Sequence, residues 1–165
     1  MITSADFTGI YAVGKNLLTT AELDDFILLN EEKYCSQIFG AELWKLIKEA
    51  IEDDIDDYPL YKKVIEPFNE DVCGRMLSST GLADVLKGLI YFDFMAYSST
   101  RPNFAGGLSA KKAENSTSSA FPEVQAYDKW NRAVTISRNI QDYIMLNSND
   151  YPEFKGVRLI YNTGF

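Results

Sequence analysis

The spacing of apolar side chains constrains this fold more than any other feature, because apolar residues recur every three or four positions along most of the chain. The longest such stretch runs from Pro122 to about Asn147. Proline suits a first helical turn, and a helix of about 25 residues spans about 37 Å. Small side chains on its inner side let another helix come close. We therefore predict a long core helix with the buried stripe Ala126, Trp130, Ala133, Ser137, Ile140 and Ile144.

Two further helices are predicted nearer the N-terminus. The first begins near Thr19, because Thr19 and Glu22 have the spacing of a capping box, and it ends at Gly40. The second covers roughly residues 41–52, so the two should form a helical hairpin. Their apolar stripes are Leu23, Phe26, Ile27, Tyr34 and Ile38 in the first helix and Leu43, Trp44, Ile47, Ala50 and Ile51 in the second.

Helical spacing returns in the middle of the chain. Pro59 opens a short helix, and the pattern is helical again over about 69–99, with a break near 78–81. Residues 89–97 are apolar nearly all the way round, which predicts a central core helix. Asp93 lies inside that run and therefore needs a hydrogen-bonding or basic partner.

Apolar residues do not recur at helical spacing at either end of the chain or in one connection between helices. Residues 101–119 form a polar loop that is longer than the roughly 2–8 residues usual between bundle helices. Residues 157–161 alternate imperfectly and read as one extended strand. The expected fold is mainly α: a helical bundle of about four main helices over residues 1–153, with a long inter-helix loop and an extended C-terminal arm over residues 154–165. An extended lead-in should attach through Phe7, Ile10, Tyr11 and Val13.

Composition excludes several classes of function. Histidine is absent, which removes the commonest general base and every Ser-His or Cys-His pair. The net charge of −8 opposes tight binding of nucleic acid. The chain has no apolar run long enough to span a membrane and no signal-peptide pattern at its start. We interpret Cys35 and Cys73 as reduced core or near-core thiols, and we expect no catalytic site and no cofactor.

The acidic run over residues 52–57 is the strongest candidate for a metal site, since calcium takes six to eight oxygen ligands from a flexible loop. An EF-hand loop begun at Asp54 would need a ligand at Tyr58 and a glycine at Pro59. The spacing therefore favours a solvated turn. A metal-assisted hydrolase using Asp53 to Asp57 stays as an alternative.

The N-terminal half resembles a known family. The opening MITSADFTGIYAVGKN, followed by an acidic amphipathic helix that runs into EEKYCSQIFGAELWKLI, is similar to the small helical head-to-tail connector proteins of tailed bacteriophages. The likeness is closest to the adaptor or ring proteins of crAss-like phages and related phages of gut bacteria. Its clearest mark is the block from Tyr34 to Leu43, with Gly40 between two helices.

The resemblance implies a structural virion protein, assembled in the host cytoplasm and located in the neck between head and tail. Such a subunit repeats about the tail axis, commonly as a twelve-fold ring. The ring docks on the portal protein, contacts other neck or tail proteins, and continues a channel through which DNA passes as cargo. The family has no catalytic residues to carry over. A helical adaptor or regulatory protein that binds a single protein partner is the alternative.

Two segments are the expected contact surfaces. The loop should be mobile in the isolated subunit and become ordered against a neighbour, since it has few apolar side chains. The arm should add a strand to another chain, because a single strand leaves its backbone groups unpaired. The alternative is a tail laid over its own bundle through Phe154, Leu159 and Phe165. The candidate interface residues are Arg101, Phe104, Leu108, Lys111 and Lys112 in the loop, and Val157, Leu159, Ile160, Tyr161 and Phe165 in the arm.

Overall fold

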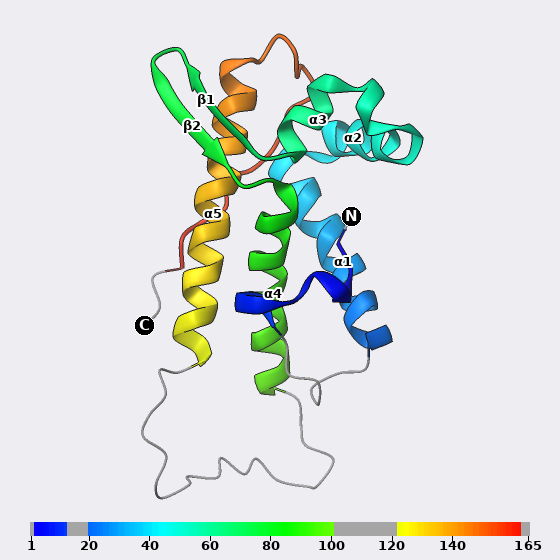
Figure 1. The fold of residues 1–165 in the computed structure, drawn as a ribbon, viewed down its shortest axis with the longest axis vertical. Coiled ribbons are helices and arrows are strands. Elements are labelled where there is room, and N and C mark those ends of the chain that lie inside the picture. The colour runs from blue at the N-terminus through cyan, green and yellow to red at the C-terminus, as the bar shows by residue number, and fades with distance from the viewer. Residues whose placement is uncertain (1, 13–19, 101–121, 163–165) are drawn as a thin grey trace, which may run out of the picture.

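The computed structural model describes residues 2–12, 20–100 and 122–162. Three long helices run side by side, with a smaller group of elements at one end (Figure 1). The fold is mainly α, as predicted. The long helices are α1 (Thr20–Phe39), α4 (Leu82–Thr100) and α5 (Pro122–Leu146). The end group consists of α2 (Ala41–Asp53), the 3-10 turn η3 (Ile55–Asp57), α3 (Pro59–Ile65), and the strands β1 (Phe68–Val72) and β2 (Arg75–Ser79).

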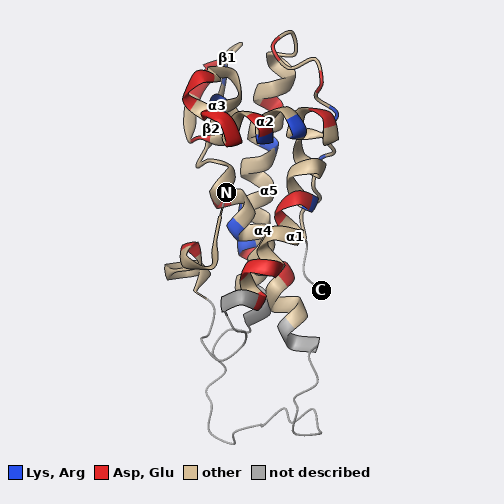
Figure 2. Cartoon of the chain, turned by 90° about the vertical axis from the view of Figure 1, so that its right-hand side faces the viewer, with Lys and Arg blue, Asp and Glu red and all other residues tan. Residues whose placement is uncertain are grey.

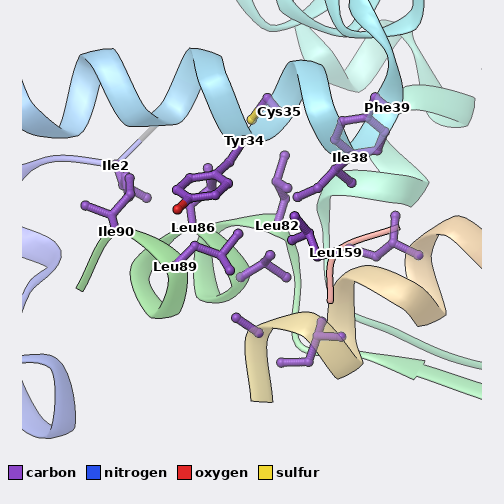
Figure 3. Packing of buried hydrophobic residues seen from close by; sticks show 14 of the residues in the cluster. Ile2, Tyr34, Cys35, Ile38, Phe39, Leu82, Leu86, Leu89, Ile90 and Leu159 are labelled. Carbon is purple, nitrogen blue, oxygen red and sulfur yellow. The ribbon is translucent and has the colours of Figure 1, made fainter. Parts of the chain in front are cut away.

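Helix α4 lies at the centre of the core, as the apolar run in the sequence predicted. Its side chains Leu86, Leu89 and Ile90 are fully buried and face α1 (Figure 3). Gly88 lies against α5, where a Cβ atom would come within 2.8 Å of both the Cβ of Ala133 and the carbonyl oxygen of Lys129. Glycine at this position therefore allows the two central helices to pack closely.

The apolar stripes predicted for α1, α2 and α5 are buried, with Phe26, Ile51 and Trp130 half-buried at their margins. Gly40 separates α1 from α2 and has φ = +83°, a conformation that residues with a side chain rarely adopt. The glycine expected to end the first helix therefore also turns the chain into the second. Thr19, the expected capping residue, lies outside the described residues.

Asp93 has the partners that its position in the core required. The hydroxyl of Tyr34 donates to Asp93 Oδ2 at 2.7 Å, and Lys33 Nζ donates to the same oxygen at 2.9 Å. Burial, reinforced by the hydrogen bond to Asp93, raises the pKa of Tyr34 well above its ordinary value. The hydrogen bond from the phenol to Asp93 ties α1 to α4.

The helix predicted over residues 69–99 is wrong in its first part, because a β-hairpin precedes α4. Strands β1 and β2 pair antiparallel, and Val72 lies opposite Arg75 across a two-residue turn. The turn residues Cys73 and Gly74 both have positive φ, at 55° and 79°, as a turn that matches the twist of a hairpin requires. Burial alternates along β2, but the sequence does not alternate between apolar and polar residues, since Met76 is exposed and Ser79 is buried.

Two expectations about individual side chains also need correction. Cys35 is fully buried in the core, where burial raises the pKa of its thiol, but Cys73 is exposed at the hairpin turn rather than near the core. In the lead-in, the 3-10 turns η1 (Ser4–Asp6) and η2 (Gly9–Tyr11) place Phe7 and Tyr11 in the core. Ile10 is exposed, contrary to expectation, because Tyr11, the next residue of η2, faces the bundle instead. Val13 lies outside the described residues.

Candidate functional site

The C-terminal segment, which we define as residues 154–162, lies along its own bundle beside α5 (Figure 1). The strand predicted over residues 157–161 is wrong: the segment is extended, but it pairs with neither strand of the hairpin. The arrangement is the alternative weighed above, a tail laid over its own bundle. The following contacts explain how a helical domain satisfies this extended backbone.

The segment first crosses the C-terminal end of α1. The amide of Lys155 donates to the carbonyl of Phe39 at 3.2 Å, and the amide of Val157 donates to that of Gln37 at 2.7 Å. Carbonyls in the last turn of a helix have no intrahelical partner, so they are free to accept these bonds. Between the two bonds, Gly156 lies so close that a Cβ atom would be 1.8 Å from the carbonyl oxygen of Ile38.

Polar side chains of α5 then bind the backbone of the segment. Gln141 Nε2 donates to the carbonyls of Ile38 and Val157 at 2.8 and 3.1 Å. Three other side chains of α5 also hydrogen-bond to the backbone of the segment. Arg138 donates to the carbonyl of Leu159, Trp130 Nε1 donates to that of Ile160 at 2.9 Å, and Asn131 exchanges two bonds with the backbone of Asn162. These bonds replace the strand partner that the sequence interpretation required.

Asp142 on α5 links the C-terminal segment to the hairpin. Its carboxylate is nearly buried, with 6% of the side chain exposed, and it accepts from Arg75 of β2 at 2.6 Å and from Arg158 of the segment. A buried carboxylate needs such partners. Since one carboxylate faces two guanidinium groups, one positive charge of this group stays uncompensated among the described residues.

The arm residues named from the sequence therefore divide into two groups. Leu159 is buried in the core, with 4% exposed. Val157 and Ile160 point outward, with 62% and 78% exposed, and Tyr161 is also exposed beneath the guanidinium of Arg138, which lies 4.2 Å from its ring centre. The outward residues leave apolar side chains exposed along the segment, next to α5. Phe165 lies outside the described residues.

A second apolar surface, which the sequence interpretation missed, lies on α1. Leu28 and Leu29 are 71% and 73% exposed, on the side of α1 that faces away from the core. Asp25 and Glu32 flank them at helical spacing, and both are exposed. The sequence signal is the run of four apolar residues from Phe26 to Leu29, because a helix that packs on one side cannot bury all four.

Acidic side chains dominate this second surface. Five acids and one lysine occur in α1, and Figure 2 shows the side of the molecule on which α1 lies. Glu32 accepts from the indole of Trp44 at 3.0 Å and from Lys48 at 3.1 Å, and the hydrogen bond from Trp44 lowers the pKa of Glu32. Asp25 has no ion-pair or hydrogen-bond partner among the described residues.

In the acidic run at Asp53 to Asp57, three carboxylates bind groups that are close in the sequence. Asp53 accepts from the hydroxyl of Tyr58 at 2.9 Å, and Asp54 accepts from the amide of Asp56, where it caps η3. Asp56 pairs with Lys62 at 2.6 Å, and this hydrogen bond raises the pKa of Lys62. No group of three or more acidic or cysteine side chains that could hold a metal ion occurs within residues 2–12, 20–100 and 122–162.

The hollows on the described surface include two wide ones. One, of about 430 Å³, is lined by Ile10 and the side chains Gln125, Asp128, Lys129 and Arg132 of α5. The other, of about 500 Å³, lies at the base of the hairpin. Neither gathers a nucleophile with a base. Among the helices that the structure describes, none is long and apolar enough to cross a membrane.

The loop residues predicted to contact a neighbour, Arg101, Phe104, Leu108, Lys111 and Lys112, lie outside the described residues. The described surface therefore offers two candidate contact regions. They are the outer side of α1 around Leu28 and Leu29, and the outward side of the C-terminal segment around Val157 and Ile160.

Comparisons with protein-family models, with curated proteins and with solved structures found no match to this chain.

Proposed function

We propose that this protein is a structural subunit of a head-to-tail connector in a tailed bacteriophage. In this role, copies of the chain form a ring that docks on the portal protein and extends the channel for DNA toward the tail. Other neck or tail proteins would bind the ring, and DNA would pass as cargo without tight contact. The resemblance of the first half of the sequence to adaptor or ring proteins supports this assignment.

One observation carries the proposal: the most exposed apolar side chains of the described residues include two separate groups, one on α1 and one on the C-terminal segment beside α5 (Figure 1). A subunit inside a ring has a neighbour on each side and needs two different contact surfaces. An adaptor that binds a single partner needs only one. The net charge of −8 supports weak contact with DNA in a channel.

Reconstitution with the portal protein encoded by the same genome tests this function. The two proteins are co-expressed, the complex is purified by size, and it is imaged by electron microscopy. We expect a ring of this chain stacked on the portal, with the symmetry axes of the two rings aligned. The portal prepared without this chain is the control and should lack the added layer.

Two results would contradict the connector function. The first is a portal ring that carries no density for this chain at high concentrations of both proteins. The second is a one-to-one complex between this chain and some other soluble protein, with no ring. That second result would support the single-partner adaptor instead.

A further inference from the structure

The two exposed apolar surfaces differ in the charge that surrounds them. On α1, Leu28 and Leu29 lie between the carboxylates of Asp25 and Glu32. Asp25 is uncompensated among the described residues, whereas Glu32 pairs with Lys48 at 3.1 Å, so one net negative charge borders the two leucines. The α1 surface is therefore an apolar pair inside an acidic border.

The C-terminal segment has the opposite character. Residues 154–162 include Lys155 and Arg158 and no acidic residue. Lys155 pairs with the exposed Glu42 at 2.7 Å, and Arg158 shares Asp142 with Arg75. Among the described residues, one positive charge of Arg75 and Arg158 therefore remains uncompensated beside the segment, in a chain whose net charge is −8.

We propose that the α1 surface of one copy docks on the C-terminal segment of the next copy, an inference that rests on the proposed ring function. Leu28 and Leu29 would pack against Val157 and Ile160. Asp25 would approach the uncompensated positive charge beside Arg158. Complementary charges select this pairing over pairings between like surfaces. Contact between two α1 surfaces would bring carboxylates together, and contact between two segments would bring cations together.

The positions of the two surfaces on the subunit determine which kind of assembly this contact forms. Helix α1 and the C-terminal segment occupy different places on the bundle, since the segment crosses the C-terminal end of α1 and then runs along α5 (Figure 1). When two copies bind through two different surfaces, the pair still has one free surface of each kind. Further copies can therefore bind until a ring closes. A contact between two identical surfaces would instead stop at a dimer.

A pair of single-surface variants tests this inference. Leu29→Glu blocks the α1 surface, and Ile160→Glu blocks the segment surface. Both side chains are more than 70% exposed, so neither change should disturb the core. Met76→Glu is the matched control, because Met76 on β2 is a similarly exposed apolar residue, 65% exposed, and belongs to neither surface. Circular dichroism confirms that each variant is folded.

Sedimentation velocity over a range of concentrations gives the readout. We expect wild type and Met76→Glu to form assemblies larger than dimers, and each blocked variant alone to be monomeric. An equimolar mixture of Leu29→Glu and Ile160→Glu should form a heterodimer and nothing larger, since only one intact pair of surfaces is available. The heterodimer should weaken as salt concentration rises.

Three outcomes would overturn the inference. These are dimers of Ile160→Glu alone, no pairing in the mixture, or a wild-type chain that stays monomeric at the highest concentration. The connector function fails separately. Assemblies that follow this pattern but never bind the portal would leave the interface intact and contradict the connector. Portal-bound rings that tolerate both blocked variants would support the connector and contradict the interface.

Discussion

Replacing Gly156 with alanine should detach the C-terminal segment from the bundle. The added Cβ would lie 1.8 Å from the carbonyl oxygen of Ile38, which accepts from Gln141, and the amides on both sides of Gly156 are hydrogen-bonded to the end of α1. Neither side can therefore yield by a simple side-chain rotation. The segment must lift away, which breaks the amide bonds of Lys155 and Val157 and exposes Leu159.

The size of the effect follows from these lost contacts. Two hydrogen bonds contribute about 0.5–1.5 kcal/mol each, and burial of a leucine contributes about 1.5–3 kcal/mol. Alanine also restricts the unfolded chain, which stabilises the folded protein by about 0.4–1 kcal/mol. The net loss in the free energy of unfolding should be about 2–5 kcal/mol, a large part of the 5–15 kcal/mol typical of a domain.

Urea denaturation measures this loss. The indole of Trp130 donates to the carbonyl of Ile160, so its fluorescence should also report detachment of the segment before the bundle unfolds. Val157→Ala is the matched control, because that side chain is 62% exposed and its replacement should change stability by about 0.5 kcal/mol or less. A Gly156→Ala midpoint equal to that of Val157→Ala would refute the reasoning. Deleting residues 154–165 should cost at least as much stability as Gly156→Ala.

Three further predictions follow. Asp142→Asn should lower the free energy of unfolding by about 1–3 kcal/mol, because it weakens the charged hydrogen bonds from Arg75 and Arg158. An unchanged midpoint in urea denaturation would contradict a stabilising role for Asp142 between the hairpin and the C-terminal segment. The folded pKa of Tyr34 is raised above its ordinary value of 10.0. The unfolded state therefore loses the proton of Tyr34 first, so the free energy of unfolding should fall as pH rises above about 10. The fall should be less steep in Tyr34→Phe. Equal dependence of the melting temperature on pH in the two proteins would contradict this prediction. Filter binding at low salt should show only weak affinity for duplex DNA, since the net charge is −8.

The sequence alone determined helices α1, α2 and α5, because their signals are local. The end of α1 at Phe39, the start of α2 at Ala41 and the start of α5 at Pro122 agree with the predicted boundaries. Apolar spacing, a glycine between helices and a proline at a first turn act within a few residues. The need of Asp93 for a partner was likewise evident from its neighbours, although the sequence did not identify Tyr34.

The hairpin and the C-terminal segment depended on tertiary structure. Residues 68–79 contain a mixed pattern, and only the packing of β2 against α5 decides between a helix and a strand pair. Leu28 and Leu29 belong to an apolar run, but the direction of the core decides which of its members stay exposed.

The same limit explains why the C-terminal segment was predicted as a strand for another chain. Its extended backbone and its unpaired groups could be inferred from the sequence, but its partners could not. Gln141 reaches Ile38, which is 103 residues away in sequence, and Gly156 packs against the same peptide unit. Hydrogen bonds between residues so far apart leave no periodic signal, so only the packing of α1 beside α5 decided that the segment is bound within its own chain.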